Sequence, residues 1–90
     1  MKVKEVMSKG AITITKDETI LDAMKVMRDK DIGFLIIAQD DEALGIITDR
    51  DIILALSKEI SVNTNITKVM KRFGFQRINR EVFTKKRKKF

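Results

Sequence analysis

The spacing of apolar positions changes from one segment of the chain to the next, and each spacing predicts a different element. Residues 3–7 place their apolar side chains on one side of a short helix, which Gly10 ends. Residues 11–15 alternate and are rich in β-branched side chains, which is typical of a strand. A longer helix begins at Thr19, whose hydroxyl can cap the first turn, with Asp22 at the position of a capping-box acid. Its apolar stripe consists of Ile20, Ala23, Met24 and Met27.

Two apolar runs follow this helix, and together they predict a hairpin. Residues 34–38 form a continuous run that is too short for an independent helix and suits a strand buried on both faces. After an acidic turn, residues 44–48 form a second apolar strand, and a helix then starts at Thr48 or Asp49 and runs to about Leu56. The order predicts an α/β (α+β) fold, a βαββα unit with a small three-stranded sheet, two packing helices and a short N-terminal helix.

The apolar pattern of residues 3–7 recurs once, in residues 66–70. The matched positions are Val3 with Ile66, Val6 with Val69, and Met7 with Met70. A five-residue match is weak alone, but this one follows directly after a complete unit. We therefore predict one domain over residues 1–70, which includes the start of a second copy as a linker helix at 66–70, and a basic C-terminal tail over residues 71–90.

The net charge of +6 is concentrated in that tail. Residues 1–70 hold ten Lys or Arg and twelve Asp or Glu, whereas residues 71–90 hold nine Lys or Arg and one acid, Glu81. The tail allows binding to nucleic acid through phosphates, with the phenylalanines stacking on bases, or binding to an anionic membrane surface. A solvated terminal tail is the interpretation we prefer, because basic tails are common and usually nonspecific.

The chain contains no cysteine and no histidine. It therefore has no disulfide framework, no thiolate chemistry, and neither the usual general base nor the commonest transition-metal ligand. No nucleophile–base pair is visible, so we expect no enzyme, no catalytic residues and no metal site. No segment is long enough to span a bilayer, and residues 1–5 lack the apolar run of a signal peptide. The expectation is a soluble, cytoplasmic protein.

Residues 45–51 carry the candidate binding chemistry. The N–H groups of a helix's first turn favour a phosphate, and the Thr48 hydroxyl at that end can donate to a phosphate oxygen. Asp51 can accept hydrogen bonds from two vicinal hydroxyls, such as those of a ribose. Gly45 lets another backbone or a flat ligand approach closely. The same spacing is also that of a helix capping box, and the two interpretations are compatible.

The order of elements and two segments resemble a cystathionine-beta-synthase (CBS) domain. These segments are Ile32-Gly33-Phe34-Leu35-Ile36-Ile37 and Gly45-Ile46-Ile47-Thr48-Asp49-Arg50-Asp51-Ile52. The resemblance covers about residues 1–70, and the glycine-apolar-apolar-Thr-x-x-Asp stretch is its most specific part. It implies a regulatory module without catalytic activity, usually present as a tandem pair. The clefts between the two copies of such a pair bind AMP, ADP, ATP or S-adenosylmethionine.

The same resemblance implies roles for individual residues. Asp51 would hold the ribose hydroxyls, and Thr48 would hold the phosphate or the ribose. Arg50 would reach a phosphate, unless it is a solvated residue paired with Asp49. The residues that would wall the adenine are Ala11, Ile12, Thr13, Ile32, Gly33 and Phe34. No cofactor is expected, since the adenosine nucleotide is the ligand.

The second copy does not continue beyond residue 70, because residues 73–78 do not reproduce the first strand or the helix start. A truncation, a frameshifted end and a naturally solitary copy all remain open. A βαββα unit leaves an apolar sheet face uncovered, which a second identical unit can cover by two-fold symmetry. We therefore predict a homodimer through sheet and helix faces, either a sensor or a structural dimer with a vestigial ligand site.

Overall fold

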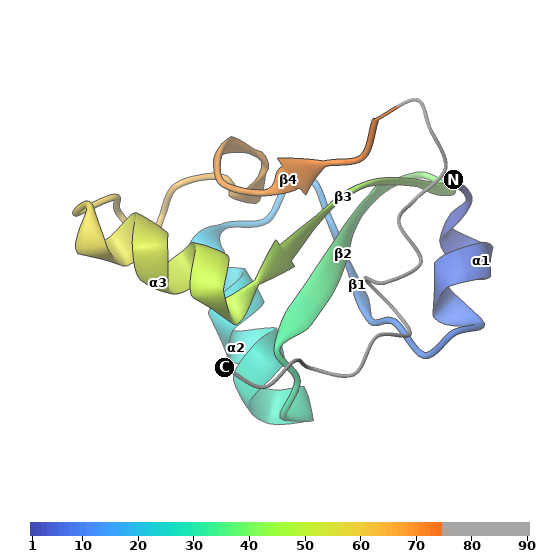
Figure 1. Cartoon of the computed structure of the whole chain (residues 1–90), viewed down its shortest axis with the longest axis horizontal. Helices are drawn as coiled ribbons and strands as arrows, with labels where there is room; N and C mark the ends of the chain where they lie inside the picture. Colours follow the sequence, from blue (N-terminus) through green and yellow to red (C-terminus); the bar gives the residue numbers. More distant parts are fainter. Residues whose placement is uncertain (75–90) are drawn as a thin grey trace.

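Four strands form one sheet in the order β1-β2-β3-β4, and the structure, a computed structural model, describes residues 1–74 (Figure 1). The elements are α1 (Val3–Met7), β1 (Thr13–Thr15), α2 (Ile20–Lys30), β2 (Phe34–Gln39), β3 (Glu42–Thr48), α3 (Asp49–Ser57), the 3₁₀ helix η1 (Ile66–Lys68) and β4 (Lys71–Arg72). β1 is parallel to β2, and the other pairings are antiparallel. The predicted fold class is confirmed. The predictions about residues 75–90, including the basic block, lie outside the described residues.

Capping residues set both ends of the helix α2, Thr19 with Asp22 at its start and Asp31 at its end. The Thr19 N–H donates to Asp22 Oδ2 at 2.9 Å, and the Asp22 N–H donates to Thr19 Oγ1 at 3.1 Å. The backbone N–H and the hydroxyl of Thr19 lower the pKa of Asp22, because both favour its ionised form. A depressed pKa means that this contribution to stability is present above the unfolded-state pKa and is lost as the pH falls through the folded-state value. Asp31 closes the helix in the left-handed conformation.

The predicted hairpin of β2 and β3 is confirmed. The two strands are joined by the two residues between Gln39 and Glu42, and Asp40 there has a positive φ of 55°, as tight hairpin turns require. The pairing runs from Gln39 opposite Glu42 to Phe34 opposite Thr48, with one register shift between Ile37 and Ala38.

Both faces of β2 are buried, as its continuous apolar run predicts. Leu35 and Ile37 belong to one apolar cluster with residues of α2 and α3, whereas Ile36 belongs to a second with Val6 of α1. Ile36 is fully buried, so the sheet face that we expected to be uncovered holds part of the core. The exposed apolar side chains lie elsewhere: among the described residues, Ile53 of α3 is the most exposed large one.

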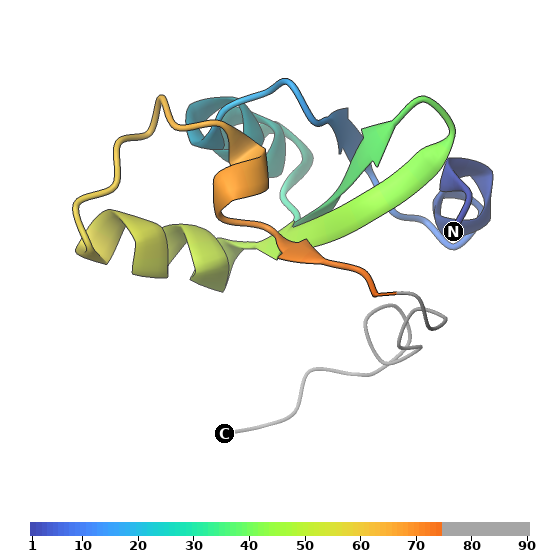
Figure 2. The ribbon, with the colours of Figure 1, turned by 90° about the horizontal axis from the view of Figure 1, so that it is seen from above.

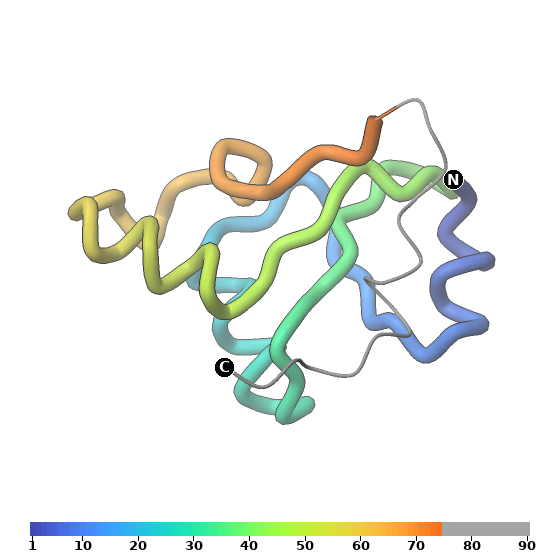
Figure 3. The backbone as a smooth tube through the Cα atoms, viewed as in Figure 1, coloured from blue at the N-terminus to red at the C-terminus, as the bar shows by residue number. Residues whose placement is uncertain are grey.

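The sheet has a fourth strand, which corrects the prediction of three. β4 consists of Lys71 and Arg72, the first residues assigned to the tail, and it pairs with Gly45 and Ile46 of β3. Figure 3 shows how the chain returns from α3 to run beside β3. A two-residue strand carries no periodic signal, so the sequence could not predict it. The predicted helix at residues 66–70 is a single 3₁₀ turn, η1, whose Ile66 is fully buried.

β4 lies so close to β3 that it requires a glycine at position 45 of β3. A Cβ atom built there would lie 2.5 Å from the Lys71 carbonyl oxygen, and the Met70 sulfur would be only 3.0 Å away. The sequence allowed two roles for Gly45, close approach of another backbone or of a flat ligand. The structure contains the first, because the backbone of β4 approaches Gly45.

Gly45→Ala should therefore lower the free energy of unfolding by about 1–3 kcal/mol, because β4 must shift to admit the methyl group. Gly33→Ala is the control, since its Cβ would meet only the end of the Asp49 side chain, at 3.2 Å, which can turn away. Denaturant unfolding of both variants measures the difference. An equal loss in the two variants would contradict this account of Gly45.

Candidate functional site

Most of the residues that the sequence singled out gather at one end of the sheet. Parallel β1 and β2 both begin there, and antiparallel β3 ends there. The Ile36 N–H donates to the Ile12 carbonyl at 2.9 Å, and the Asp49 N–H donates to the Gly33 carbonyl, also at 2.9 Å. Because Phe34 pairs with Thr48, the start of β2 lies directly beside the start of α3. This edge, formed by residues 12–13, 32–34 and 48–51, is called the β3–α3 edge below.

The β3–α3 edge is fixed by a capping box at the start of α3. The Thr48 N–H donates to Asp51 Oδ2 at 2.9 Å, and the Asp51 N–H donates to Thr48 Oγ1 at 3.1 Å. The capping interpretation is therefore correct, and it sets the positions of both side chains. The Thr48 hydroxyl hydrogen is not used by this box, so it remains a donor for another group.

Asp51 has a further partner that the sequence did not reveal. Lys71 Nζ of β4 lies 3.0 Å from Asp51 Oδ1. The Asp51 side chain is only 8% exposed, whereas that of Lys71 is 72% exposed. Each carboxylate oxygen of Asp51 thus carries a hydrogen bond. The one signal that could have indicated Lys71 is its place directly after the repeated pattern at 66–70.

Two predicted residues, Ala11 and Gly45, lie outside the β3–α3 edge, and a third, Arg50, lies on it without its expected partner. Ala11 is buried beside Val6 and belongs to the core. Gly45 lies inside β3, against β4, and not at the edge itself. Arg50 is exposed in the first turn of α3, and the described residues contain no ion pair between Arg50 and Asp49.

The box at Thr19 and Asp22 is a structural twin of the one at Thr48 and Asp51. The corresponding hydrogen bonds have the same lengths, 2.9 and 3.1 Å. In the described part of the chain, Asp22 forms no ion pair, whereas Asp51 pairs with Lys71. Variants of the box at Thr19 and Asp22 therefore report the loss of a helix cap alone. Any further effect of an Asp51 variant reflects another role of Asp51.

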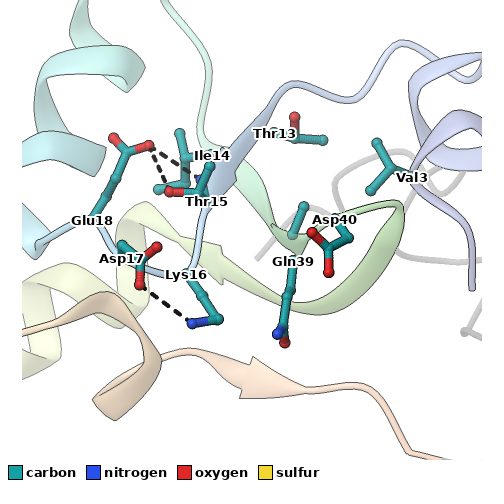
Figure 4. Close-up of a pocket in the computed structure, with 10 residues that line it drawn as sticks. Val3, Thr13, Ile14, Thr15, Lys16, Asp17, Glu18, Gln39 and Asp40 are labelled. Carbon is teal, nitrogen blue, oxygen red and sulfur yellow. Dashed lines mark hydrogen bonds and ion pairs between the residues drawn. The ribbon is translucent and has the colours of Figure 1, made fainter.

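A larger hollow lies at the opposite end of the sheet, near the hairpin turn, with a volume of about 560 Å³ (Figure 4). Four of its polar residues are engaged in pairs: Glu18 Oε2 accepts from the Thr15 N–H at 3.2 Å, and Lys16 pairs with Asp17 at 3.3 Å. The Asp17 side chain is 81% exposed. These are solvated surface contacts, and they do not converge on a point where a ligand would be held.

A smaller hollow of about 250 Å³ lies between α3 and the chain segment that contains η1. It is lined by Asp51, Leu54, Ala55, Lys58, Ile60, Lys68 and Val69. Asp51 therefore borders this hollow as well as the β3–α3 edge.

Within residues 1–74, no group of three acidic side chains is arranged to hold a metal ion. No helix in that part of the chain has the length and apolar character needed to cross a membrane.

Comparison with known proteins gives a consistent picture. The family model for the CBS domain matches residues 3–58. The uncharacterized protein MJ1232 of Methanocaldococcus jannaschii is 46% identical over 63 residues, which cover 69% of this chain and 21% of that protein. Hypoxic response protein 1 of Mycobacterium tuberculosis is 38% identical over 63 residues, which cover 68% of this chain and 44% of that protein. This chain thus spans less than half of each of these two relatives.

A solved structure is similar in fold and in sequence. It is the CBS domain pair of protein MJ0100, in complex with 5′-methylthioadenosine and S-adenosyl-L-methionine. The TM-score is 0.63 and the identity 31%, over 81% of this chain and 60% of that one.

Thr48→Ala should lower the free energy of unfolding by about 1 kcal/mol, because it removes the acceptor for the Asp51 N–H. Thr19→Ala should lower the free energy of unfolding by about the same amount, since the hydrogen bond from the Asp22 N–H to the Thr19 hydroxyl has the same length. Denaturant unfolding compares the two. Two variants as stable as the parent would show that neither box contributes to stability.

Proposed function

This chain belongs to the CBS domain family, and on that premise we propose that it is a non-catalytic regulatory module that binds an adenosine ligand. The candidates are AMP, ADP, ATP and S-adenosylmethionine. The observation that carries the proposal is the position of Thr48 and Asp51, which a capping box holds beside the start of β2. A hydroxyl donor and a carboxylate acceptor are thereby fixed next to an apolar strand end.

Each part of the β3–α3 edge suits one part of such a ligand. Asp51 accepts hydrogen bonds from the two ribose hydroxyls, and Thr48 donates to a phosphate or ribose oxygen. Phe34, half-buried at the start of β2, supplies an apolar surface for the adenine. Arg50, exposed on the first turn of α3, is available to a phosphate. The adenosine ligands of the MJ0100 domain pair support this assignment.

We further propose that two copies of the chain form the complete cleft. The relative that binds adenosine ligands is a domain pair, of which this chain covers 60%. On α3, Ile53 is 65% exposed and Leu54 is 46% exposed, which leaves an apolar strip beside the site. A second copy packed on α3 by two-fold symmetry would bury this strip and bring two β3–α3 edges together.

Calorimetric titration with AMP, ATP and S-adenosylmethionine tests the ligand. Binding in the micromolar range, about −8 kcal/mol, is the expected result for at least one of them. Asp51→Ala should weaken it by roughly 1–3 kcal/mol, since both ribose hydroxyls lose their acceptor. Asp22→Ala is the matched control, because it breaks the twin capping box and should leave affinity unchanged. Absence of binding by all three ligands would contradict the sensor proposal and leave the structural dimer.

Light scattering tests the dimer. The parent chain should have the mass of a dimer, and Ile53→Asp should weaken association about tenfold or more, because it places a charge in the apolar interface. Met7→Asp is the control, as Met7 is 53% exposed but lies on α1 at the other end of the molecule (Figure 1). A folded, monomeric parent chain would overturn this proposal.

A further inference from the structure

We infer that Lys71 makes the β3–α3 edge selective for adenosine ligands that carry a phosphate. The inference rests on the proposed function and adds to it the charge class of the ligand. It starts from the ion pair between Lys71 Nζ and Asp51 Oδ1, 3.0 Å apart, with which the proposed ribose contact would compete.

The fold directs the Lys71 side chain to this position. Lys71 pairs with Ile46 of β3, and cross-strand partners project to the same side of a sheet. Thr48 is two residues further along β3 and therefore projects to that side too. Figure 2 shows β4 beside β3, close to the point where α3 begins. The long side chain thus runs along β3 toward the first turn of α3.

Contacts on both sides of Lys71 hold its backbone in place. Met70 precedes it and is buried in the core. The Phe73 N–H, two residues later, donates to the Leu44 carbonyl at 3.0 Å. Gly45 allows the approach between them, because any larger residue would meet the Lys71 carbonyl oxygen. The backbone of Lys71 is therefore held at a place from which the ammonium group reaches Asp51.

Asp51 cannot serve Lys71 and a ribose fully at the same time. One of its oxygens accepts from the Thr48 N–H, the other accepts from Lys71, and only 8% of the side chain is exposed. Two ribose hydroxyls that reach this carboxylate compete with the ammonium for the small part of it that is exposed. The Lys71 side chain can move away from Asp51, since it is 72% exposed and its four-carbon stem is flexible.

The fate of the displaced ammonium depends on the charge of the ligand. A phosphate offers it a new anionic partner close by, whereas an uncharged nucleoside offers none. The first turn of α3 also carries two acids, Asp49 and Asp51, which repel a phosphate, and Lys71 adds to Arg50 to offset them. Binding of a phosphate-bearing ligand thus exchanges one ion pair for another.

Affinities for AMP and adenosine, which differ only in the phosphate, test the inference by calorimetry. The parent chain should prefer AMP, and Lys71→Gln should weaken AMP binding about five- to tenfold while adenosine binding stays equal or improves. Arg72→Gln is the matched control: it removes the same charge from β4, but Arg72 pairs with Gly45 and projects to the other side of the sheet. The preference of Arg72→Gln for AMP over adenosine should equal that of the parent. Lys71→Arg keeps the charge and should keep the preference.

The outcomes separate this inference from the proposed function. If the parent binds adenosine as tightly as AMP, or if Lys71→Gln leaves the ratio unchanged, the selectivity role is wrong and the ligand site stands. If neither ligand binds the parent or Lys71→Gln, this inference fails, and the titrations with ATP and S-adenosylmethionine decide whether the proposed function fails with it. Added salt should reduce the preference of the parent more than that of Lys71→Gln, in which Arg50 is the remaining cation of the site. Thermal unfolding by circular dichroism verifies that each variant is folded.

Discussion

Burial of β2 on both of its faces is the constraint on which the rest of the structure depends. Leu35, Ile36 and Ile37 are fully buried, so each face of this strand must be covered by other elements. α2 and α3 share one apolar cluster with β2, and α1 shares the other. Because β2 is covered on both faces, only its ends reach the surface. The β3–α3 edge is one of these ends.

Local signals in the sequence were sufficient to predict most of the fold. The two capping boxes, the β-branched alternation and the continuous run of residues 34–38 each depend on neighbouring residues, and each predicted its element correctly. β4 and η1 are different, because they are short and are defined by contacts with distant residues. Gly45, for example, is explained by a strand about twenty-five residues later in the chain.

The same distinction applies to the site. Thr48 and Asp51 are three residues apart, so their spacing alone predicted how they contact each other. The contact between Lys71 and Asp51 joins residues 20 positions apart and needs β4 to form it. The site also combines two tasks, because the atoms that would receive a ligand are those that cap α3. Changes at Thr48 or Asp51 therefore affect folding as well as binding, which is why the twin box at Thr19 and Asp22 is informative.

The two outer strands of the sheet have a consequence for how copies of this chain can meet. β1 has three residues and β4 has two, and both residues of β4 are exposed and positively charged. Such short or charged edges do not offer the row of free N–H and C=O groups that a further strand needs. Extension of the sheet from one molecule to the next is therefore disfavoured, which also protects the chain from edge-to-edge aggregation. Within residues 1–74, the faces of the sheet and the helices are therefore better suited to a specific contact between copies than the strand edges are.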